Sequence, residues 1–170
     1  MKSPTSEVVS VKQFIGTKII LAVAMTRLSY NEYRDWALPA DENGADEGYL
    51  VEYTDGGAPN HPAHAGYISW SPKAQFDNAY RPTSGMSFGL AIEALKLGKR
   101  VARAGWNGKG MWLALAGAES HWRASIAGEG MPQDWQGYSP FIAMYTAENL
   151  LVPWLASQTD MLADDWQLVD

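Results

Sequence analysis

The sequence predicts an α+β fold made of two small domains, residues 1–85 and 86–170. Three observations lead to this prediction. Short β-branched or alternating runs separated by turn residues are typical of antiparallel strands. Residues 87–97 carry a helical spacing of apolar side chains. Residues 81–85 (RPTSG) form a turn-rich stretch just before that helix, which favours a boundary there.

The amino-acid composition indicates a globular protein and excludes several classes of function. The chain has 170 residues, is 46% hydrophobic and 19% charged, and carries a net charge of −6. These values are typical of a globular protein, and the negative charge argues against nucleic acid as a partner. The sequence has no Cys, which excludes a disulfide scaffold, a thiol nucleophile and Cys-ligated zinc. With no long apolar run and no signal-peptide pattern, we expect no membrane association and a cytoplasmic protein.

The first domain reads as a small mixture of strands and helices. We expect strands over residues 17–24, 48–54 and 67–70. Helices are predicted over residues 28–36, with Ser29 as the N-cap, and over residues 72–79. Asp55-Gly56-Gly57 predicts a turn, and a Pro- and His-containing loop follows it.

The second domain is predicted to be one helix laid on an antiparallel sheet. Phe88, Ile92 and Leu95 recur at helical spacing, and Gly98 marks the end of the helix. Strands are expected over residues 99–103, 111–115, 140–146, 150–154 and 166–169, with an Asn-Gly turn at residues 107–108 and a Gly-rich loop over residues 116–138. A capping box from Ser157 to Asp160 predicts a one-turn helix.

The first candidate site is a basic cluster beside a tryptophan. Its five cations are Lys96, Lys99, Arg100, Arg103 and Lys109. Trp106, Asn107 and four glycines lie among or beside them. Arginine forks bind phosphate oxygens, an indole stacks on a base, and glycines allow a ligand to approach the backbone. The cluster therefore suits a nucleotide-like anion. The alternative is a solvated basic turn with Trp106 packed into the core.

The second candidate site is the start of the predicted one-turn helix. Trp154 precedes it, and Ser157, Gln158, Thr159 and Asp160 offer hydrogen-bond donors and acceptors. A helix start presents unpaired backbone N–H groups, which favour a polar or anionic ligand edge. The alternative is that Ser157 and Asp160 only cap the helix.

Catalytic and metal-binding patterns are weak. His61 and His64 form an H-x-x-H pair, but they lie in a Pro-containing loop with no third ligand, so no metal is expected. No nucleophile-elbow or zincin motif is present. The adjacent carboxylates of Asp164 and Asp165 are expected to be solvated. We therefore expect no catalytic residue and no cofactor.

Three strings in the second half are distinctive: FGLAIEALKLGK at residues 88–99, VARAGWNGKGM at residues 101–111 and VPWLASQTDMLADDW at residues 152–166. On these strings the chain resembles the Thoeris anti-defence protein 2 family of phage and prophage proteins, over about residues 86–169. DEGYLVEY at residues 46–53 and GYISWSPK at residues 66–73 resemble a module of phage and prophage proteins with no assigned role.

The resemblance implies a homotetramer without enzymatic activity that sequesters a cyclic ADP-ribose-type signal and leaves it intact. It also implies that some members hold cyclic oligonucleotides. By motif, Trp106 and Asn107 would line the ligand pocket, with Arg103 near the phosphates. The full set of expected ligand-binding residues is Arg103, Trp106, Asn107, Lys109, Trp154, Ser157, Gln158, Thr159 and Asp160. The alternatives are a phage structural or assembly accessory protein and a nucleotide-processing hydrolase.

Overall fold

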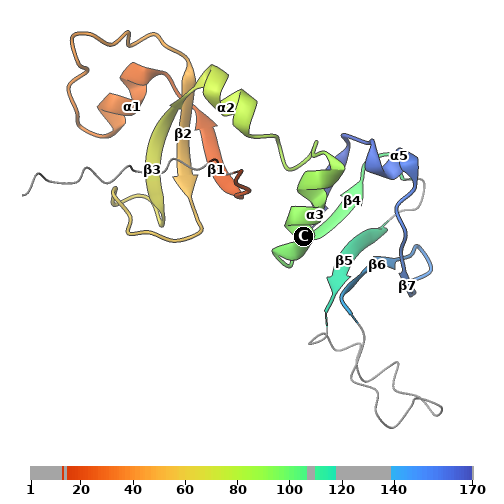
Figure 1. Ribbon diagram of the computed structural model, residues 1–170. Coiled ribbons are helices and arrows are strands. Elements are labelled where there is room, and N and C mark those ends of the chain that lie inside the picture. The colour runs from red at the N-terminus through yellow and green to blue at the C-terminus, as the bar shows by residue number, and fades with distance from the viewer. Residues whose placement is uncertain (1–12, 14, 107–109, 118–138, 170) are drawn as a thin grey trace, which may run out of the picture. The chain divides into compact units, whose positions relative to one another are not determined.

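The computed structural model describes residues 13, 15–106, 110–117 and 139–169 (Figure 1). The chain divides into two compact units, Met1–Phe76 (unit 1) and Asp77–Asp170 (unit 2). Both contain an antiparallel sheet and short helices, so the predicted α+β class is confirmed. The domain boundary that the sequence suggests at residue 85 lies inside unit 2 and stays a prediction.

Unit 1 is built on a three-stranded antiparallel sheet in the order β1-β2-β3. The strands are β1 (Ile20–Ala24), β2 (Gly48–Tyr53) and β3 (Tyr67–Pro72), and the first helix is α1 (Arg27–Tyr33). Helix α2 (Lys73–Ala79) begins in unit 1 and crosses the boundary after Phe76. All five were predicted from the sequence in type and order. The predicted turn after β2 is also present, because Gly56 and Gly57 both adopt positive φ.

Helix α1 and the first turn of α2 contact opposite faces of the sheet of unit 1. Tyr30 of α1 is buried against Leu50 and Ile68. On the other face, the ring of Tyr49 stacks on Phe76 of α2 at 4.0 Å. Residues 49 and 50 are neighbours in β2 and therefore point to opposite sides. One aromatic side chain from a helix thus packs on each face of this small sheet.

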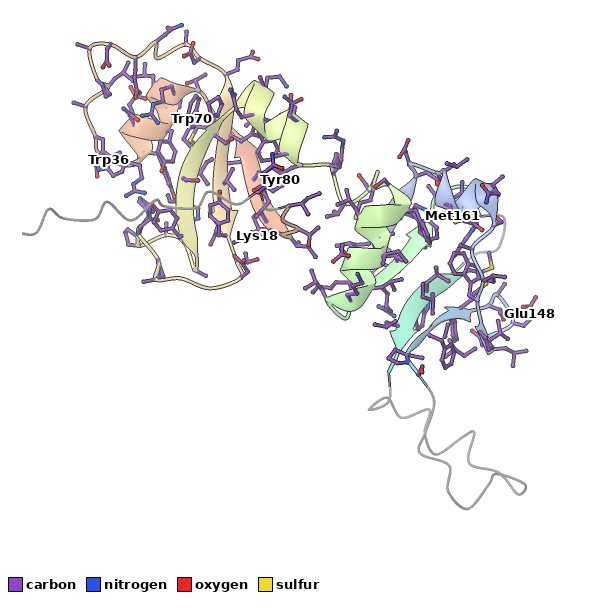
Figure 2. All side chains as sticks on the ribbon, viewed as in Figure 1. Lys18, Trp36, Trp70, Tyr80, Glu148 and Met161 are labelled. Atoms are coloured by element: carbon purple, nitrogen blue, oxygen red, sulfur yellow. The ribbon has the colours of Figure 1, made fainter. Side chains whose placement is uncertain are left out.

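The predicted N-cap of α1 is wrong. Thr26, with extended backbone, caps the helix, and its hydroxyl accepts the N–H of Ser29. The helix also ends earlier than expected, at Tyr33, and Asp35 follows with φ of 53°. Trp36 therefore lies beyond the helix, as an exposed side chain at the edge of unit 1 (Figure 2).

Unit 2 carries a five-stranded antiparallel sheet in the order β7-β6-β5-β4-β8. The strands are β4 (Arg100–Arg103), β5 (Trp112–Ala116), β6 (Phe141–Tyr145), β7 (Leu151–Pro153) and β8 (Trp166–Val169), and the helices are α3 (Phe88–Lys96) and α5 (Gln158–Met161). The predicted Asn-Gly turn at 107–108 and residues 118–138 of the predicted loop lie outside the described residues.

Helix α3 packs on one face of this sheet, as the sequence predicts. Ala91, Ala94 and Leu95 are buried in one cluster with Val101 of β4 and Trp166 of β8. Ser87 caps the helix by accepting the N–H of Leu90, and Gly98 ends it with φ of 77°. This packing fixes β4 and β8 next to each other and so positions the residues at their ends.

Candidate functional site

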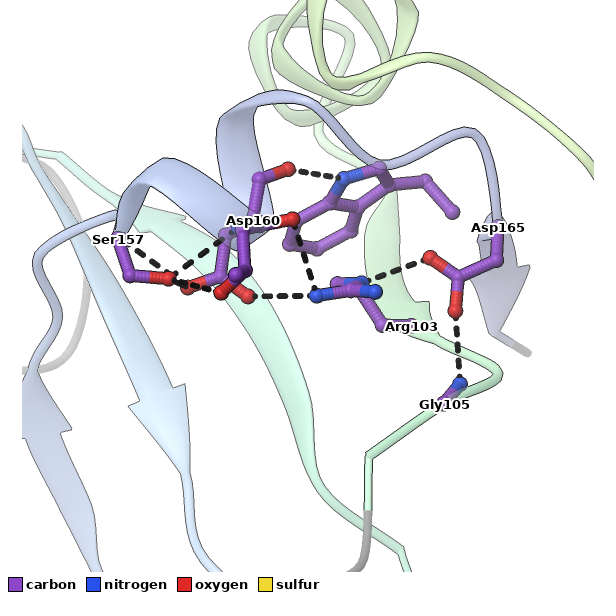
Figure 3. A network of polar contacts seen from close by, with 7 residues as sticks. Arg103, Gly105, Ser157, Asp160 and Asp165 are labelled. Atoms are coloured by element: carbon purple, nitrogen blue, oxygen red, sulfur yellow. Dashed lines mark hydrogen bonds and ion pairs between the residues drawn. The ribbon is translucent and has the colours of Figure 1, made fainter.

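Arg103, the last residue of β4, is the centre of a polar network (Figure 3). Its Nε donates to Oδ1 of Asp165 at 2.7 Å, and its Nη1 donates to Oδ1 of Asp160 at 3.0 Å. The second carboxylate oxygen of Asp165 accepts the N–H of Gly105 at 2.8 Å. The network therefore joins the end of β4, the following turn and the segment between α5 and β8.

The predicted capping box at the start of α5 is confirmed. The backbone N–H of Asp160 donates to Oγ of Ser157 at 3.2 Å, and the N–H of Ser157 donates to Oδ2 of Asp160 at 3.0 Å. The hydroxyl of Ser157 also contacts that of Thr159 at 2.8 Å. One carboxylate oxygen of Asp160 therefore accepts the N–H of Ser157 in the cap, and the other accepts a hydrogen bond from Arg103.

The pKa values of these groups follow from their contacts. The hydrogen bond to Asp165 raises the pKa of Arg103. The same bond, helped by the N–H of Gly105, lowers the pKa of Asp165. Desolvation acts to raise the pKa of Asp160, but hydrogen bonds from Ser157, Arg103 and Trp106 outweigh it and leave that pKa lowered. At neutral pH one cation is therefore held between two ionised carboxylates.

Three tryptophans meet above this network. Trp166 is completely buried, and its indole N–H donates to the carbonyl oxygen of Asp160 at 3.0 Å. Trp106 and Trp154 pack against it with ring centroids at 5.5 and 6.0 Å, and against each other at 6.3 Å. Trp106 and Trp154 are only half-buried. Part of each of these two side chains is therefore open to solvent.

The basic cluster that the sequence predicts is not assembled as one cationic surface. Lys96 pairs with Glu93 at 2.7 Å, and the guanidinium of Arg100 lies over the ring of Trp112 at 5.0 Å. Arg103 is engaged by two aspartates. Lys99 is exposed. Most of the described cations of this cluster thus have partners of their own.

The predicted ligand-binding residues fall into two groups. Those that the structure gathers around α5 and the end of β4 are Arg103, Trp106, Trp154, Ser157, Thr159 and Asp160, and Gln158 lies exposed in the first turn of the same helix. Asn107 and Lys109 lie outside the described residues. Ligand binding at any of these residues stays a prediction.

Sequence reasoning missed the role of Asp165. The sequence suggested a solvated carboxylate, but Asp165 binds Arg103 and Gly105. The pairing of β4 with β8 explains this contact. Arg103 lies opposite Trp166 in that pair, so Asp165, the residue before Trp166, lies close to Arg103. The two predicted strands alone, without their pairing, could not reveal this.

A second aromatic group on the sheet was also missed. The rings of Trp112 and Tyr145 are paired across β5 and β6 and stack at 5.0 Å, with Arg100 over Trp112. Arg100 and Trp112 alternate with Val101 and Leu113, which face α3. The group therefore lies on the face of the sheet opposite the helix.

A hollow of about 580 Å³ lies elsewhere in unit 2. Asn78, Arg81, Ser87 and Asp164 are among its lining residues, and none of the predicted ligand-binding residues lines it. The candidate site is thus a surface of half-buried tryptophans beside a polar helix start. It is separate from this hollow.

Within residues 13, 15–106, 110–117 and 139–169, no group of three or more His, Asp or Glu side chains is arranged to hold a metal ion. His61 and His64 lie near each other, but His64 is bonded to Glu52 and Tyr33. In the same part of the chain, no helix is both long and apolar enough to span a bilayer.

Fold and site together define unit 2 as a small helix-on-sheet domain with an aromatic and polar surface at one end of β4. Residues 86–169 match the family model described as Tad2-like, a Thoeris anti-defense 2-like domain. A curated relative, Thoeris anti-defense 2 of Bacillus phage SP01, is 43% identical over 86 residues, which are 49% of this chain and 94% of the relative. The chain belongs to the Thoeris anti-defense 2 family, and this membership supports a role in phage anti-defence.

Proposed function

We propose that unit 2 binds and sequesters a cyclic ADP-ribose-type immune signal and releases it chemically unchanged. The family of residues 86–169 supports an anti-defence role, and sequestration is the form of that role that needs only binding. The protein would act in the host cytoplasm during infection. No cofactor enters this proposal.

The observation that carries the proposal is the position of Trp106. Its half-buried indole lies against Trp154 and Trp166, and its hydrogen bond contributes to the low pKa of Asp160. An indole held in this way offers a rigid stacking surface for a purine. The exposed side chains of Gln158 and Thr159 lie in the adjacent helix turn and can serve ribose hydroxyls or the edge of the base.

Arg103 enters the proposal in a different role from the one the motif suggests. Its charge is balanced by Asp160 and Asp165, so it is a poor partner for a pyrophosphate. We propose that it positions the start of α5 and the turn after β4. Asn107 and Lys109 follow Trp106 in sequence and are the proposed contacts to ribose and phosphate.

Association of two copies of unit 2 would enclose the ligand from a second side. Leu155 and Leu162 flank α5 and are 91% and 78% exposed. A surface that carries two such open apolar side chains can be covered by another chain. We propose that copies of unit 2 associate through this surface into a homotetramer, which light scattering on the purified protein tests directly.

The experiment that tests the proposal is signal recovery. The purified protein is incubated with an extract that contains a cyclic ADP-ribose signal made by a TIR enzyme, separated by filtration and heated. Mass spectrometry then identifies what is released. Intact signal supports sequestration, a converted product indicates a hydrolase, and no depletion of the extract overturns the proposal. A parallel incubation with cyclic oligonucleotides tests the second ligand class.

A phage assembly accessory is the second candidate function. The exposed Leu155 and Leu162 that support a homotetramer would equally suit a different protein partner. In that case the protein would deplete no nucleotide from the extract. Signal recovery therefore separates the two candidates.

A further inference from the structure

Unit 1 contains a chain of three hydrogen-bonded side chains that the proposed function does not use. Nδ1 of His64 lies 2.8 Å from Oε2 of Glu52, and Nε2 of the same ring lies 2.9 Å from the hydroxyl of Tyr33. Glu52 comes from β2, Tyr33 ends α1, and His64 lies in the loop before β3. The fold therefore brings together a carboxylate, an imidazole and a phenol from three separate segments.

The contacts of Glu52 fix which way the protons lie. Its second oxygen accepts the N–H of Gly66 at 2.8 Å. The hydrogen bond from His64, followed by that from Gly66, lowers the pKa of Glu52, so the carboxylate is ionised at neutral pH. In the neutral form of His64, Nδ1 then carries the proton and the lone pair of Nε2 faces the hydroxyl of Tyr33. In this arrangement the phenol donates to the imidazole.

The exposure of the three groups increases along the chain of hydrogen bonds. The side chains of Glu52 and His64 are 12% and 16% exposed, whereas Tyr33 is 37% exposed. Glu52 alone already holds the loop through Gly66 and His64. The hydrogen bond to an exposed phenol adds little stability. A carboxylate that orients a histidine towards an accessible hydroxyl is the arrangement that activates a nucleophile.

We propose that Tyr33 is a nucleophile, activated by His64 and Glu52, that accepts an acyl group from uncharged activated esters. Its phenolic oxygen bonds to the ester carbonyl carbon while its proton passes to Nε2 of His64. The ester C–O bond then breaks, and the departing oxygen leaves with that bond's electron pair and takes the proton from His64. The products are O-acyl-Tyr33 and the alcohol, with no other reactant consumed.

The surroundings favour an uncharged acyl group over a phosphoryl group. Transfer of a phosphoryl group needs cations around the reacting centre. The two arginines nearest in sequence are engaged elsewhere: Arg27 forms an ion pair with Glu42, and the guanidinium of Arg34 lies over the ring of Trp36 at 4.1 Å. The charge next to the histidine is the anion of Glu52. The rings of His61 and Tyr33 stack at 4.5 Å, which gives a neutral substrate an aromatic surface.

The first test compares two tyrosines of the unmodified full chain. The protein is treated with p-nitrophenyl acetate at neutral pH, and mass spectrometry of its peptides measures acetylation at each tyrosine. Tyr67 is the internal control, because it is 47% exposed and its ring lies beside that of Tyr53. We expect Tyr33 to react at least about tenfold faster, since a positioned general base is worth about 10²–10⁴-fold. Equal rates at the two tyrosines would overturn the proposal.

Two variants then test the origin of the reactivity. Glu52→Gln and His64→Phe should each bring acetylation of Tyr33 down to the rate of Tyr67, which serves as the reference within each variant. Circular dichroism in the near ultraviolet confirms that the variants are folded. A folded His64→Phe protein whose Tyr33 still reacts fast would show that the histidine is not the base. The result is independent of signal sequestration by unit 2.

Discussion

Arg103 and Asp165 are joined by a 2.7 Å hydrogen bond between residues that lie 62 positions apart in the sequence. The bond links the end of β4 to the residue before β8. The other oxygen of Asp165 holds the N–H of Gly105, the residue before Trp106. The orientation of the half-buried tryptophan therefore depends on this ion pair.

Replacing Arg103 with methionine should destabilise unit 2. The change leaves the carboxylates of Asp160 and Asp165 without their cation in a partly buried place, and we expect the free energy of unfolding to fall by about 2 kcal/mol. Urea unfolding of the full chain, followed by tryptophan fluorescence, measures the loss. Lys96→Met is the matched control, because its pair with Glu93 is exposed and worth about 0.5 kcal/mol or less. Equal losses in the two variants would contradict a central role for Arg103.

The same ion pairs predict a loss of stability in acid. The pKa values of Asp160 and Asp165 in the folded protein lie below the ordinary value of 3.8. A lowered pKa contributes stability above the unfolded-state pKa, and that contribution disappears as the pH falls through the folded-state pKa. Asp165→Asn should therefore be less stable than the natural protein at pH 7, and the gap should close from about pH 5 downward.

The pH prediction is checked by urea unfolding at a series of pH values. The control is Asp164→Asn, because Asp164 is exposed and the carboxylates that pair with Arg103 are those of Asp160 and Asp165. If the gap for Asp165→Asn stayed constant down to the lowest pH at which the protein folds, ionisation of Asp165 would not be the cause.

Local signals in the sequence predicted much of the fold. The spacing of Phe88, Ile92 and Leu95 and the stop at Gly98 belong to one short segment, and the structure has that helix at Phe88–Lys96. The β6–β7 hairpin is local as well: Asn149 adopts the positive φ of 60° that its turn requires, and asparagine tolerates this conformation. Such features need no knowledge of the rest of the chain.

The features that sequence reasoning missed depend on distant contacts. Thr26 and Ser29 are both suitable caps, and the choice follows from where β1 ends, since the N–H of Met25 still bonds to the carbonyl of Gly48 in β2. The partners of Arg103 are 57 and 62 positions away, so its string of neighbouring cations suggested a phosphate site instead. Residue spacing could not show that aspartates already balance its charge.

Removing the N-cap of α5 should lower the free energy of unfolding of unit 2 by a small amount. Ser157→Ala deletes the hydroxyl that accepts the N–H of Asp160, and such losses cost about 1 kcal/mol of stability. Thr159→Ala is the control, because among the described residues the hydroxyl of Thr159 bonds to that of Ser157 and not to a backbone N–H. Urea unfolding measures both. A Ser157→Ala protein as stable as Thr159→Ala would show that the capping box does not hold α5 in place.

A fragment of residues 77–170 should bind the signal as tightly as the full chain. Residues 86–170 should bind too but fold less stably, because the carbonyl of Thr83 accepts the N–H of Leu168 in β8 at 2.8 Å. Losing that hydrogen bond costs about 1 kcal/mol. Calorimetric titration and urea unfolding of both fragments check the two statements. A folded fragment 77–170 that fails to bind would place part of the site in unit 1.

Trp106→Ala should strongly weaken binding of the signal while unit 2 stays folded. The indole is half-buried beside Trp154 and Trp166, so its removal costs some packing, but Trp166 and α3 keep the core intact. Loss of a base-stacking surface costs about 1–3 kcal/mol of binding free energy, and loss of the contact to Asp160 adds to it. Trp36→Ala is the matched control, since Trp36 is 52% exposed in unit 1 and should leave binding unchanged. Calorimetric titration with the recovered signal measures both affinities. A folded Trp106→Ala protein with the affinity of the Trp36→Ala control would move the ligand to another surface, with the stacked pair Trp112 and Tyr145 the first to test.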